Sequence, residues 1–314
     1  MSPDTLPGTA VIGLGAMGLP MARRLASQLP VTVYDIDPNR RAQVASDGAT
    51  DAGSVAEAAR NADIVLLAVR DQAQLDSALF GEGGAAPAMR PGAVVVLTST
   101  VGPDVARATA ERLDEYGVLT VDAPVSGGPA RAGNGDLLVL VGGSDEALAS
   151  ARPVLDLLAS TLTVVGPRVG DGQALKAINQ LLAGVHIAAA AEAVALAREL
   201  GLDPGTVIES LRHGAAGSFM FGDRGPRMVQ AYGEGAEVRS RLDIFVKDMG
   251  IVTDIARTAH VPLPLTSAAQ QLYLLGERAG LGAQDDSSVV TVLSPDGAFP
   301  GGHPGRASEG HDAK

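Results

Sequence analysis

The stretch from residue 10 to residue 18 reads Ala-Val-Ile-Gly-Leu-Gly-Ala-Met-Gly, and it decides the fold. Gly13, Gly15 and Gly18 have the spacing G-x-G-x-x-G, with an apolar run before them and a helical pattern after them. In a dinucleotide-binding turn, the first glycine makes the turn, the second lets a pyrophosphate approach, and the third lets the helix pack on the strand. The stretch therefore predicts a dinucleotide site at a helix N-terminus, although a strand–turn–helix without a ligand can carry the same spacing.

A second apolar run, residues 31–34, ends at Asp35, about 20 residues after the glycines. A carboxylate at this place binds the 2′-hydroxyl of a ribose and repels the 2′-phosphate of NADP. Arg40 and Arg41 follow closely and weaken this argument, because an arginine can accept that phosphate. The sequence predicts NAD as the cofactor, with NADP as the alternative.

Apolar strand patterns alternate with helical patterns through the first half of the chain. The strand patterns span residues 9–12, 31–34, 62–69, 93–98, 117–122, 137–141 and 162–165. Several of them are continuous apolar runs, as expected of strands that are covered on both faces. The predicted fold class is therefore α/β, with an N-terminal Rossmann-type doubly wound sheet that is mostly parallel.

The alternation stops at Gly166-Pro167, and helical patterns follow. They span residues 172–200, 203–213, 218–231, 243–260, 265–280 and 285–292. From residue 294 the chain is rich in proline, glycine and polar residues. The predicted domains are a dinucleotide-binding domain at 1–166, an all-helical substrate and dimerisation domain at 167–293, and a disordered tail at 294–314.

Composition excludes several classes of function. The chain has 314 residues and a net charge of −12, and it shows no cluster of basic residues, which disfavours binding to nucleic acid or to an anionic membrane. The absence of cysteine excludes a thiol nucleophile, a cysteine-type zinc site and a disulfide. The five histidines are scattered, so no metal site is predicted. The first residues do not form a signal peptide, and we expect a cytoplasmic protein.

The run at residues 181–197 is apolar enough to raise the question of a membrane. It contains His186 and Glu192 and is mostly alanine, which favours a buried helix of a soluble protein. A helix as long as residues 172–200 needs a covering surface, and a second subunit is the simplest one. We therefore expect a homodimer or a homotetramer.

Asp122-Ala-Pro-Val-Ser-Gly-Gly128 follows a predicted strand, so it lies at the carboxyl edge of the sheet, where ligands bind. The hydroxyl of Ser126 and the N–H groups of Gly127 and Gly128 are donors that suit a carboxylate. The alternative is a turn in which Asp122 and Ser126 satisfy their own backbone. The residues alone leave both readings open.

Lys176 lies in the second turn of the long helical pattern, and Asn179 shares its face. Apolar neighbours lower the proton affinity of a desolvated lysine, which suits an acid/base. The alternative is an exposed lysine near a helix start. His186 lies two turns beyond Asn179 and is either a substrate contact or a satisfied core histidine. Lys247-Asp248 has the spacing of an ordinary surface charge pair.

Taken together, these motifs resemble the β-hydroxyacid dehydrogenase family over residues 8–293. The matching segments are Gly13-Leu-Gly-Ala-Met-Gly-Leu-Pro-Met21, Asp122-Ala-Pro-Val-Ser-Gly-Gly128, Gly172-x-x-x-Lys176-x-x-Asn179 and Lys247-Asp248. The residues from Asn179 to Glu192, from Leu242 to Met249 and from Asp285 to Val290 look most like the L-threonate dehydrogenase branch. The family often has a proline near the end of the third strand, where this chain has Ala68-Val69-Arg70.

The resemblance implies a role for each matching residue. Lys176 is implied to be the catalytic acid/base, with Asn179 holding both lysine and substrate. The substrate is expected at Ser126, Gly127, Gly128, Asn179 and His186. The cofactor is expected at Gly13, Leu14, Gly15, Ala16, Met17, Gly18, Asp35, Ala68, Val69, Thr100 and Lys247.

The expected activity is the NAD-dependent oxidation of a hydroxyl group in a small hydroxy acid or sugar acid such as L-threonate. Activity as a 3-hydroxyisobutyrate dehydrogenase or a tartronate semialdehyde reductase is the first alternative. An imine reductase is a further one, although relatives with that activity usually lack the lysine. A non-enzymatic alternative is a protein that binds the cofactor without catalysis, such as a sensor.

Overall fold

The computed structural model describes residues 6–295, and these form two compact units. The first unit comprises Met1–Leu181 and Gly250–Pro262, and the second comprises Leu182–Met249 and Leu263–Lys314, each taken over its described residues.

The first unit is built on a nine-stranded sheet. Its strands are β1 (Thr9–Ile12), β2 (Val31–Tyr34), β3 (Thr50–Asp51), β4 (Ile64–Leu67), β5 (Val94–Leu97), β6 (Leu119–Asp122), β7 (Val125–Ser126), β8 (Leu137–Gly142) and β9 (Ala159–Gly166). Their order is β3-β2-β1-β4-β5-β6-β8-β7, with β9 paired to β8. All pairs are parallel except β6–β8 and β7–β8. The predicted mostly parallel, doubly wound sheet is confirmed.

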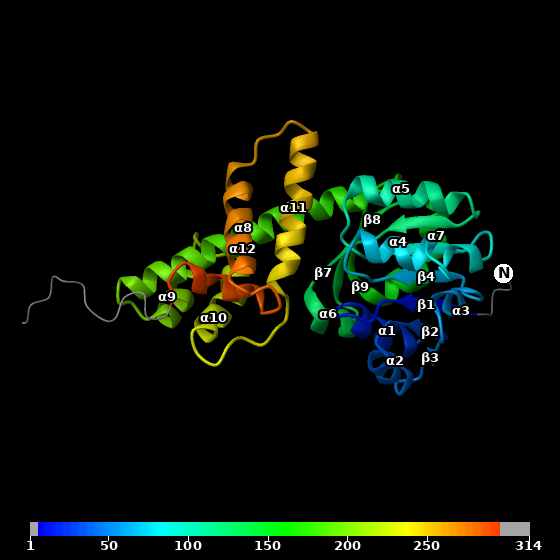
Figure 1. Ribbon diagram of the computed structural model, residues 1–314, viewed down its shortest axis with the longest axis horizontal. Helices are drawn as coiled ribbons and strands as arrows, with labels where there is room; N and C mark the ends of the chain where they lie inside the picture. The colour runs from blue at the N-terminus through cyan, green and yellow to red at the C-terminus, as the bar shows by residue number, and fades with distance from the viewer. Residues whose placement is uncertain (1–5, 296–314) are drawn as a thin grey trace, which may run out of the picture. The chain divides into compact units, whose positions relative to one another are not determined.

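Helices cover both faces of this sheet. They are α1 (Gly18–Ala26), α2 (Pro38–Ala45), α3 (Val55–Ala59), α4 (Gln72–Phe80), α5 (Pro103–Asp114), α6 (Gly128–Asn134) and α7 (Asp145–Leu158), with the short 3-10 helix η1 (Ala86–Ala88). Along β1, Val11 packs into the core shared with α1 and α7, whereas Ala10 and Ile12 pack into the core shared with α3, α4 and α5. Figure 1 shows α4 and α5 beside one part of the sheet and α1 and α2 beside another. This alternation explains the continuous apolar strand patterns.

The strand order reverses between β1 and β4. In doubly wound sheets, ligands bind in the crevice outside the carboxyl ends of the strands at this switch point. The glycine turn follows β1, and Ala68 and Val69 follow β4. The topology therefore brings these two segments to the same edge of the sheet.

The second unit is helical. Its elements are α8 (Asp171–Glu199), which begins in the first unit, α9 (Pro204–Leu211), α10 (Phe219–Ala231), α11 (Leu242–Thr258), which ends in the first unit, α12 (Pro264–Arg278) and the 3-10 helix η2 (Asp286–Val292). Over the described residues, its only strand-like contact is an isolated bridge between Arg241 and Asp285. The predicted all-helical C-terminal region is confirmed, with η2 as a tighter helix than the pattern indicated.

The long helix α8 is long and apolar enough to cross a membrane, judged by length and composition. More than half of its most apolar window (56%) is nevertheless buried within the described protein. Ile187, Ala191 and Val194 of α8 lie in the core of the second unit, together with Phe245 and Tyr273. These contacts are those of a core helix.

The predicted tail begins at residue 294, and from residue 296 onward it lies outside the described residues. Ser294 itself is buried, its hydroxyl donates to Glu199 at 2.6 Å, and its carbonyl accepts from Arg198 at 3.2 Å. The last described residues of the chain are therefore held against the end of α8.

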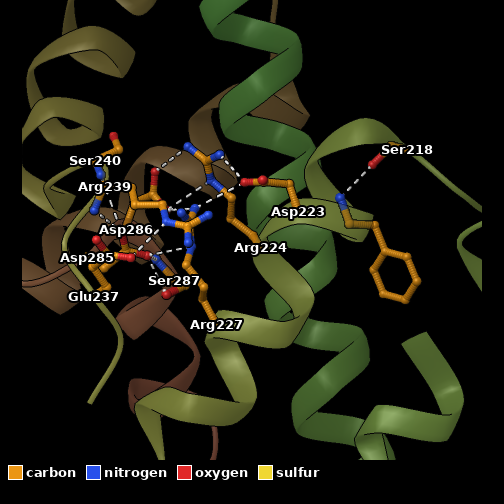
Figure 2. Close-up of polar contacts among 11 residues, drawn as sticks. Ser218, Asp223, Arg224, Arg227, Glu237, Arg239, Ser240, Asp285, Asp286 and Ser287 are labelled. Atoms are coloured by element: carbon orange, nitrogen blue, oxygen red, sulfur yellow. Dashed lines mark hydrogen bonds and ion pairs between the residues drawn. The ribbon is translucent and has the colours of Figure 1, made fainter. Parts of the chain in front are cut away.

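A buried charge network joins η2 to α10 (Figure 2). The guanidinium of Arg224 donates to both carboxylate oxygens of Asp286, at 3.1 and 2.9 Å. Arg227 pairs with Asp285 at 3.3 Å, and both arginines donate to Asp223. Asp285 also accepts the N–H groups of residues 239 and 240, just before α11. The network thus fixes the beginning of α11 as well as η2.

We predict that Asp286→Asn lowers the free energy of unfolding by about 3–5 kcal/mol, because it removes the buried one of the two carboxylates that pair with the guanidinium of Arg224. The measurement is urea unfolding followed by circular dichroism. Glu209→Gln breaks an exposed ion pair with Arg212 in the same unit and should change stability little. Equal losses of unfolding free energy in the two variants would contradict the conclusion that the buried network stabilises this unit.

Candidate functional site

The glycine turn after β1 has the geometry that a dinucleotide requires. Gly13 has a positive φ of 92°, and an added Cβ would lie 2.6 Å from the carbonyl oxygen of Ala68. A Cβ on Gly18 would collide with the carbonyl of Gly13, so this glycine sets how closely α1 packs. A Cβ on Gly15 would meet no atom within 4 Å. Open space therefore lies before Gly15, where the motif expects a pyrophosphate.

The N-terminus of α1 also fits an anion. Met17 occupies its N-cap position and gives no side-chain hydrogen bond to the first turn. By contrast, α2, α4 and α7 are capped by Asp37, Asp71 and Ser144. The first turn of a helix has free N–H groups and a positive dipole end, which together favour phosphate.

Asp35 is buried at the end of β2 and holds the glycine turn in place. One carboxylate oxygen accepts the N–H of Leu14 at 2.6 Å, and the other accepts the N–H of Asp37 at 2.8 Å. The guanidinium of Arg40 lies 3.9 Å from the same carboxylate, and the Arg40 side chain is about half exposed. Asp35 and Arg40 thus lie together where the sequence predicts that NAD and NADP are distinguished. These residues fit a dinucleotide cofactor.

The segments after β4 and β5 are joined by a hydrogen bond. Ser99 accepts the N–H of Val69 at 2.9 Å through its hydroxyl. Thr98 donates to the carbonyl of Leu67 at 2.7 Å. Ala68 and Thr100, both predicted cofactor contacts, therefore lie on neighbouring segments at the carboxyl edge. Arg70 is exposed, and its N–H donates to Gln74 at 3.0 Å.

The segment from Asp122 to Gly128 contains a strand that sequence patterns missed. β7 has only two residues, too few for a periodic pattern, and Ser126 pairs with Leu138 of β8. Gly127 and Gly128 both have positive φ values, 144° and 80°. Successive N–H groups in a tight, partly left-handed bend suit a carboxylate, as the sequence predicts.

The carboxylate of Asp122 binds the beginning of α8. Its two carboxylate oxygens accept the N–H of Gly170 at 2.9 Å and the N–H of Gln173 at 2.7 Å. Asp122 is fully buried, and burial raises its pKa to about 6, while the hydrogen bonds from Gly170 and Gln173 oppose the rise. The first turn of α8 is therefore bound to the end of β6, although about 50 residues separate the two in the sequence.

The glycine of the Gly172-x-x-x-Lys176 motif is required by this close approach. A Cβ on Gly172 would lie 2.9 Å from the Asp122 carboxylate and would collide with the carbonyl of Leu140. Lys176, one turn later, is only 6% exposed. The predicted exposed-lysine alternative is thus wrong. Asn179 is partly buried and donates to Gln180 at 2.8 Å.

Gln173 is a site residue that the sequence motifs did not single out. It is buried, and its amide contacts the loop after β5: Val101 and Gly102 donate to its oxygen, and its nitrogen donates to the carbonyl of Ser99. The sequence marks Gln173 only by its place beside Gly172, and this place does not predict its hydrogen-bond partners.

Two predicted site residues belong to the second unit. His186 is partly buried on α8. Lys247 on α11 lies 2.6 Å from Asp248, which is buried, so this pair is more enclosed than a surface charge pair. Over residues 6–295, no group of three or more histidine, aspartate or glutamate side chains is arranged to hold a metal ion.

Comparison with known proteins places this site in a family. Residues 9–166 match the model described as the NAD-binding domain of 6-phosphogluconate dehydrogenase. Residues 170–293 match the model described as NAD-binding of NADP-dependent 3-hydroxyisobutyrate dehydrogenase. The first match covers the glycine turn and the Asp122 segment, and the second covers Lys176.

Individual relatives agree with the family models. L-threonate dehydrogenase of Cupriavidus necator is 42% identical over 292 residues, covering 93% of this chain and 95% of the relative. A crystal structure of 3-hydroxyisobutyrate dehydrogenase from Salmonella typhimurium is 38% identical with a TM-score of 0.85, covering 91% of this chain and 99% of that one. A further structure, Psf3 with NADP+ and 2-OPP, is 25% identical with a TM-score of 0.83, covering 91% of this chain and 100% of that one.

The glycine turn, the buried lysine and these matches over nine-tenths of the chain lead to one assignment. The chain belongs to the β-hydroxyacid dehydrogenase family, whose members are NAD(P)-dependent oxidoreductases.

Proposed function

We propose that the chain oxidises a hydroxyl group of a small sugar acid, L-threonate or a close four-carbon relative, with NAD as the preferred cofactor. The observation that carries this proposal is the buried amine of Lys176 on a helix turn that is hydrogen-bonded to the Asp122–Gly128 segment. The similarity to the L-threonate dehydrogenase of Cupriavidus necator supports the substrate class.

The chain's own residues supply binding and proton transfer. The hydroxyl of Ser126 and the N–H groups of Gly127 and Gly128 bind the substrate carboxylate. Lys176 in its neutral form accepts the hydroxyl proton while the hydride leaves the carbon that bears this hydroxyl, and Asn179 orients the hydroxyl. A nicotinamide dinucleotide, with its pyrophosphate held at the glycine turn, would supply the hydride acceptor. The alcohol loses one proton and one hydride, of which Lys176 takes the proton.

Burial of Lys176 favours this role over a structural one. An amine withdrawn from water is held in one orientation by its surroundings, and fixed orientation contributes strongly to rate. The same residue argues against imine reduction, because the family resemblance implies that imine reductases usually lack this lysine. 3-Hydroxyisobutyrate and tartronate semialdehyde remain the alternative substrates, since both carry the same carboxylate and oxygen function.

We also propose that the protein is a cytoplasmic homodimer or homotetramer. On α8, Ile178, Leu182 and Leu196 are each at least half exposed, at 55%, 50% and 59%. Apolar side chains at this density on one helix favour a covering subunit. The role of His186 toward the substrate stays a prediction from its place on the long helix, and the role of Lys247 toward the cofactor stays a prediction from the family resemblance.

Cofactor preference should depend on Asp35. We predict that Asp35→Ala weakens NAD binding by about 10-fold or more, because a charged hydrogen bond contributes about 1.5–3 kcal/mol. NADP binding should weaken less, since the carboxylate that repels the 2′-phosphate is gone while Arg40 remains. Fluorescence titration with both cofactors measures this. Asp47→Ala removes an exposed carboxylate that pairs with Arg23 of the same unit and serves as the control. Tighter binding of NADP than of NAD by the wild-type protein would contradict the proposal.

The reaction itself is tested with a panel of three- to six-carbon hydroxy acids, followed by NADH absorbance. We predict turnover of L-threonate or a close relative. Lys176→Met should lower the single-turnover rate of hydride transfer by about 100-fold or more while NAD affinity changes little. Lys176→Arg keeps the charge but cannot accept the proton, so it should be equally slow. A near-normal rate in Lys176→Met would remove this lysine from the mechanism.

A further inference from the structure

Gln173 connects the carboxyl ends of neighbouring strands through one buried side chain. Its amide oxygen accepts the N–H of Val101 at 3.1 Å and the N–H of Gly102 at 3.2 Å, and its amide nitrogen donates to the carbonyl of Ser99 at 2.9 Å. Its own N–H donates to Asp122. The loop after β5, the end of β6 and the first turn of α8 therefore meet at this residue.

The connection extends to the segment after β4. Ser99, whose carbonyl accepts from Gln173, also accepts the N–H of Val69 through its hydroxyl. β4, β5 and β6 are adjacent parallel strands, so their carboxyl ends lie in one row along the sheet edge. Gln173 thus fixes the loops on which the cofactor contacts Val69 and Thr100 are predicted, relative to the helix that carries Lys176.

We propose that Gln173 is a positioning residue that holds the cofactor-side loop, residues 99–102, and the Lys176-bearing turn of α8 in a fixed mutual geometry. This inference rests on the proposed function, in which hydride acceptor and proton acceptor act on one substrate alcohol. Gln173 and Lys176 are three residues apart on the helix and share its buried face. A displacement of the first turn therefore displaces the amine, and a misplacement of about 1 Å can cost about 100-fold in rate.

The amide group of Gln173 suits the three hydrogen bonds that it makes to the loop after β5. Two backbone donors lie on one side of the amide and one carbonyl acceptor on the other. A glutamine satisfies all three at once without burying a charge. A methionine fills the same volume and satisfies none. A glutamate satisfies all three only when it is protonated, because an ionised carboxylate faces the carbonyl of Ser99 with no proton to donate.

This difference gives the test a signature that a purely structural role does not predict. Gln173→Met should lower the single-turnover rate of hydride transfer by about 10-fold or more, with a smaller change in KM. In Gln173→Glu, the rate divided by the wild-type rate at the same pH should be near one at low pH and should fall as the new carboxyl ionises. The charged groups Asp122, Asp171 and Lys176 are present in both proteins, so taking the ratio removes effects common to both.

A second measurement does not depend on turnover. In the cofactor-free protein, hydrogen exchange of peptides that cover residues 99–102 and 170–176 should speed up in Gln173→Met. Thr109→Val is the matched control, because it removes a buried hydroxyl that bonds only to its own helix, at Val105. This variant should leave exchange in both peptides and the hydride-transfer rate close to wild type.

The outcomes separate the two claims. If the wild-type protein turns over no hydroxy acid, the proposed function fails, while the exchange data still decide whether Gln173 joins loop and helix. Unchanged exchange in Gln173→Met overturns the inference. A hydride-transfer rate within twofold of wild type, or a Gln173→Glu ratio that is independent of pH, also overturns it. If Gln173→Met does not fold, Gln173→Glu at low and high pH decides the question alone.

Discussion

The buried carboxylate of Asp122 holds the first turn of α8, and the position of the candidate site depends on this interaction. Both oxygens accept N–H groups of a helix start, where backbone donors have no partner within the helix. The negative charge also lies at the positive end of the helix dipole. Lys176 follows within two turns, so the end of β6 determines where the amine lies. Gly172 permits the approach because a Cβ has no room there.

Much of the first unit could be predicted, because its signals are local. The spacing of Gly13, Gly15 and Gly18 reflects contacts between residues a few positions apart, and continuous apolar runs reflect strands buried on both faces. The order of strands and helices followed from these patterns. Elements without a local signal were missed: β3 and β7 have two residues each, and η2 is a 3-10 helix within a pattern that predicted an ordinary one.

The contacts that build the site could not be predicted, since they join residues far apart in the chain. Asp122 is 48 residues from Gly170, and Gln173 is 74 residues from Ser99. A sequence motif marks Asp122 and Gly172 as notable without saying that they touch. Arg224 and Asp286 also lie 62 residues apart and form a buried ion pair. Motifs identify residue types; the fold determines their partners.

The Asp122 interaction has a pH dependence whose sign follows from its raised pKa. The pKa rises from 3.8 to about 6 on burial, so ionisation of this group opposes folding. Its contribution to stability is fully present below pH 3.8 and is lost as the pH rises through about 6. Asp122→Asn lacks this titration. Thr120→Val, which removes a buried hydroxyl without a hydrogen-bond partner in the described part of the chain, keeps it.

The most direct measurement is urea unfolding of the wild-type protein and both variants at pH 5 and pH 8. Because one pKa unit corresponds to about 1.4 kcal/mol, the wild-type protein should lose about 1.5 kcal/mol relative to Asp122→Asn between these pH values. Thr120→Val should follow the wild type. Identical pH dependence in the wild-type protein and Asp122→Asn would contradict the account, because it would mean that no buried carboxylate of raised pKa fastens α8 to the sheet.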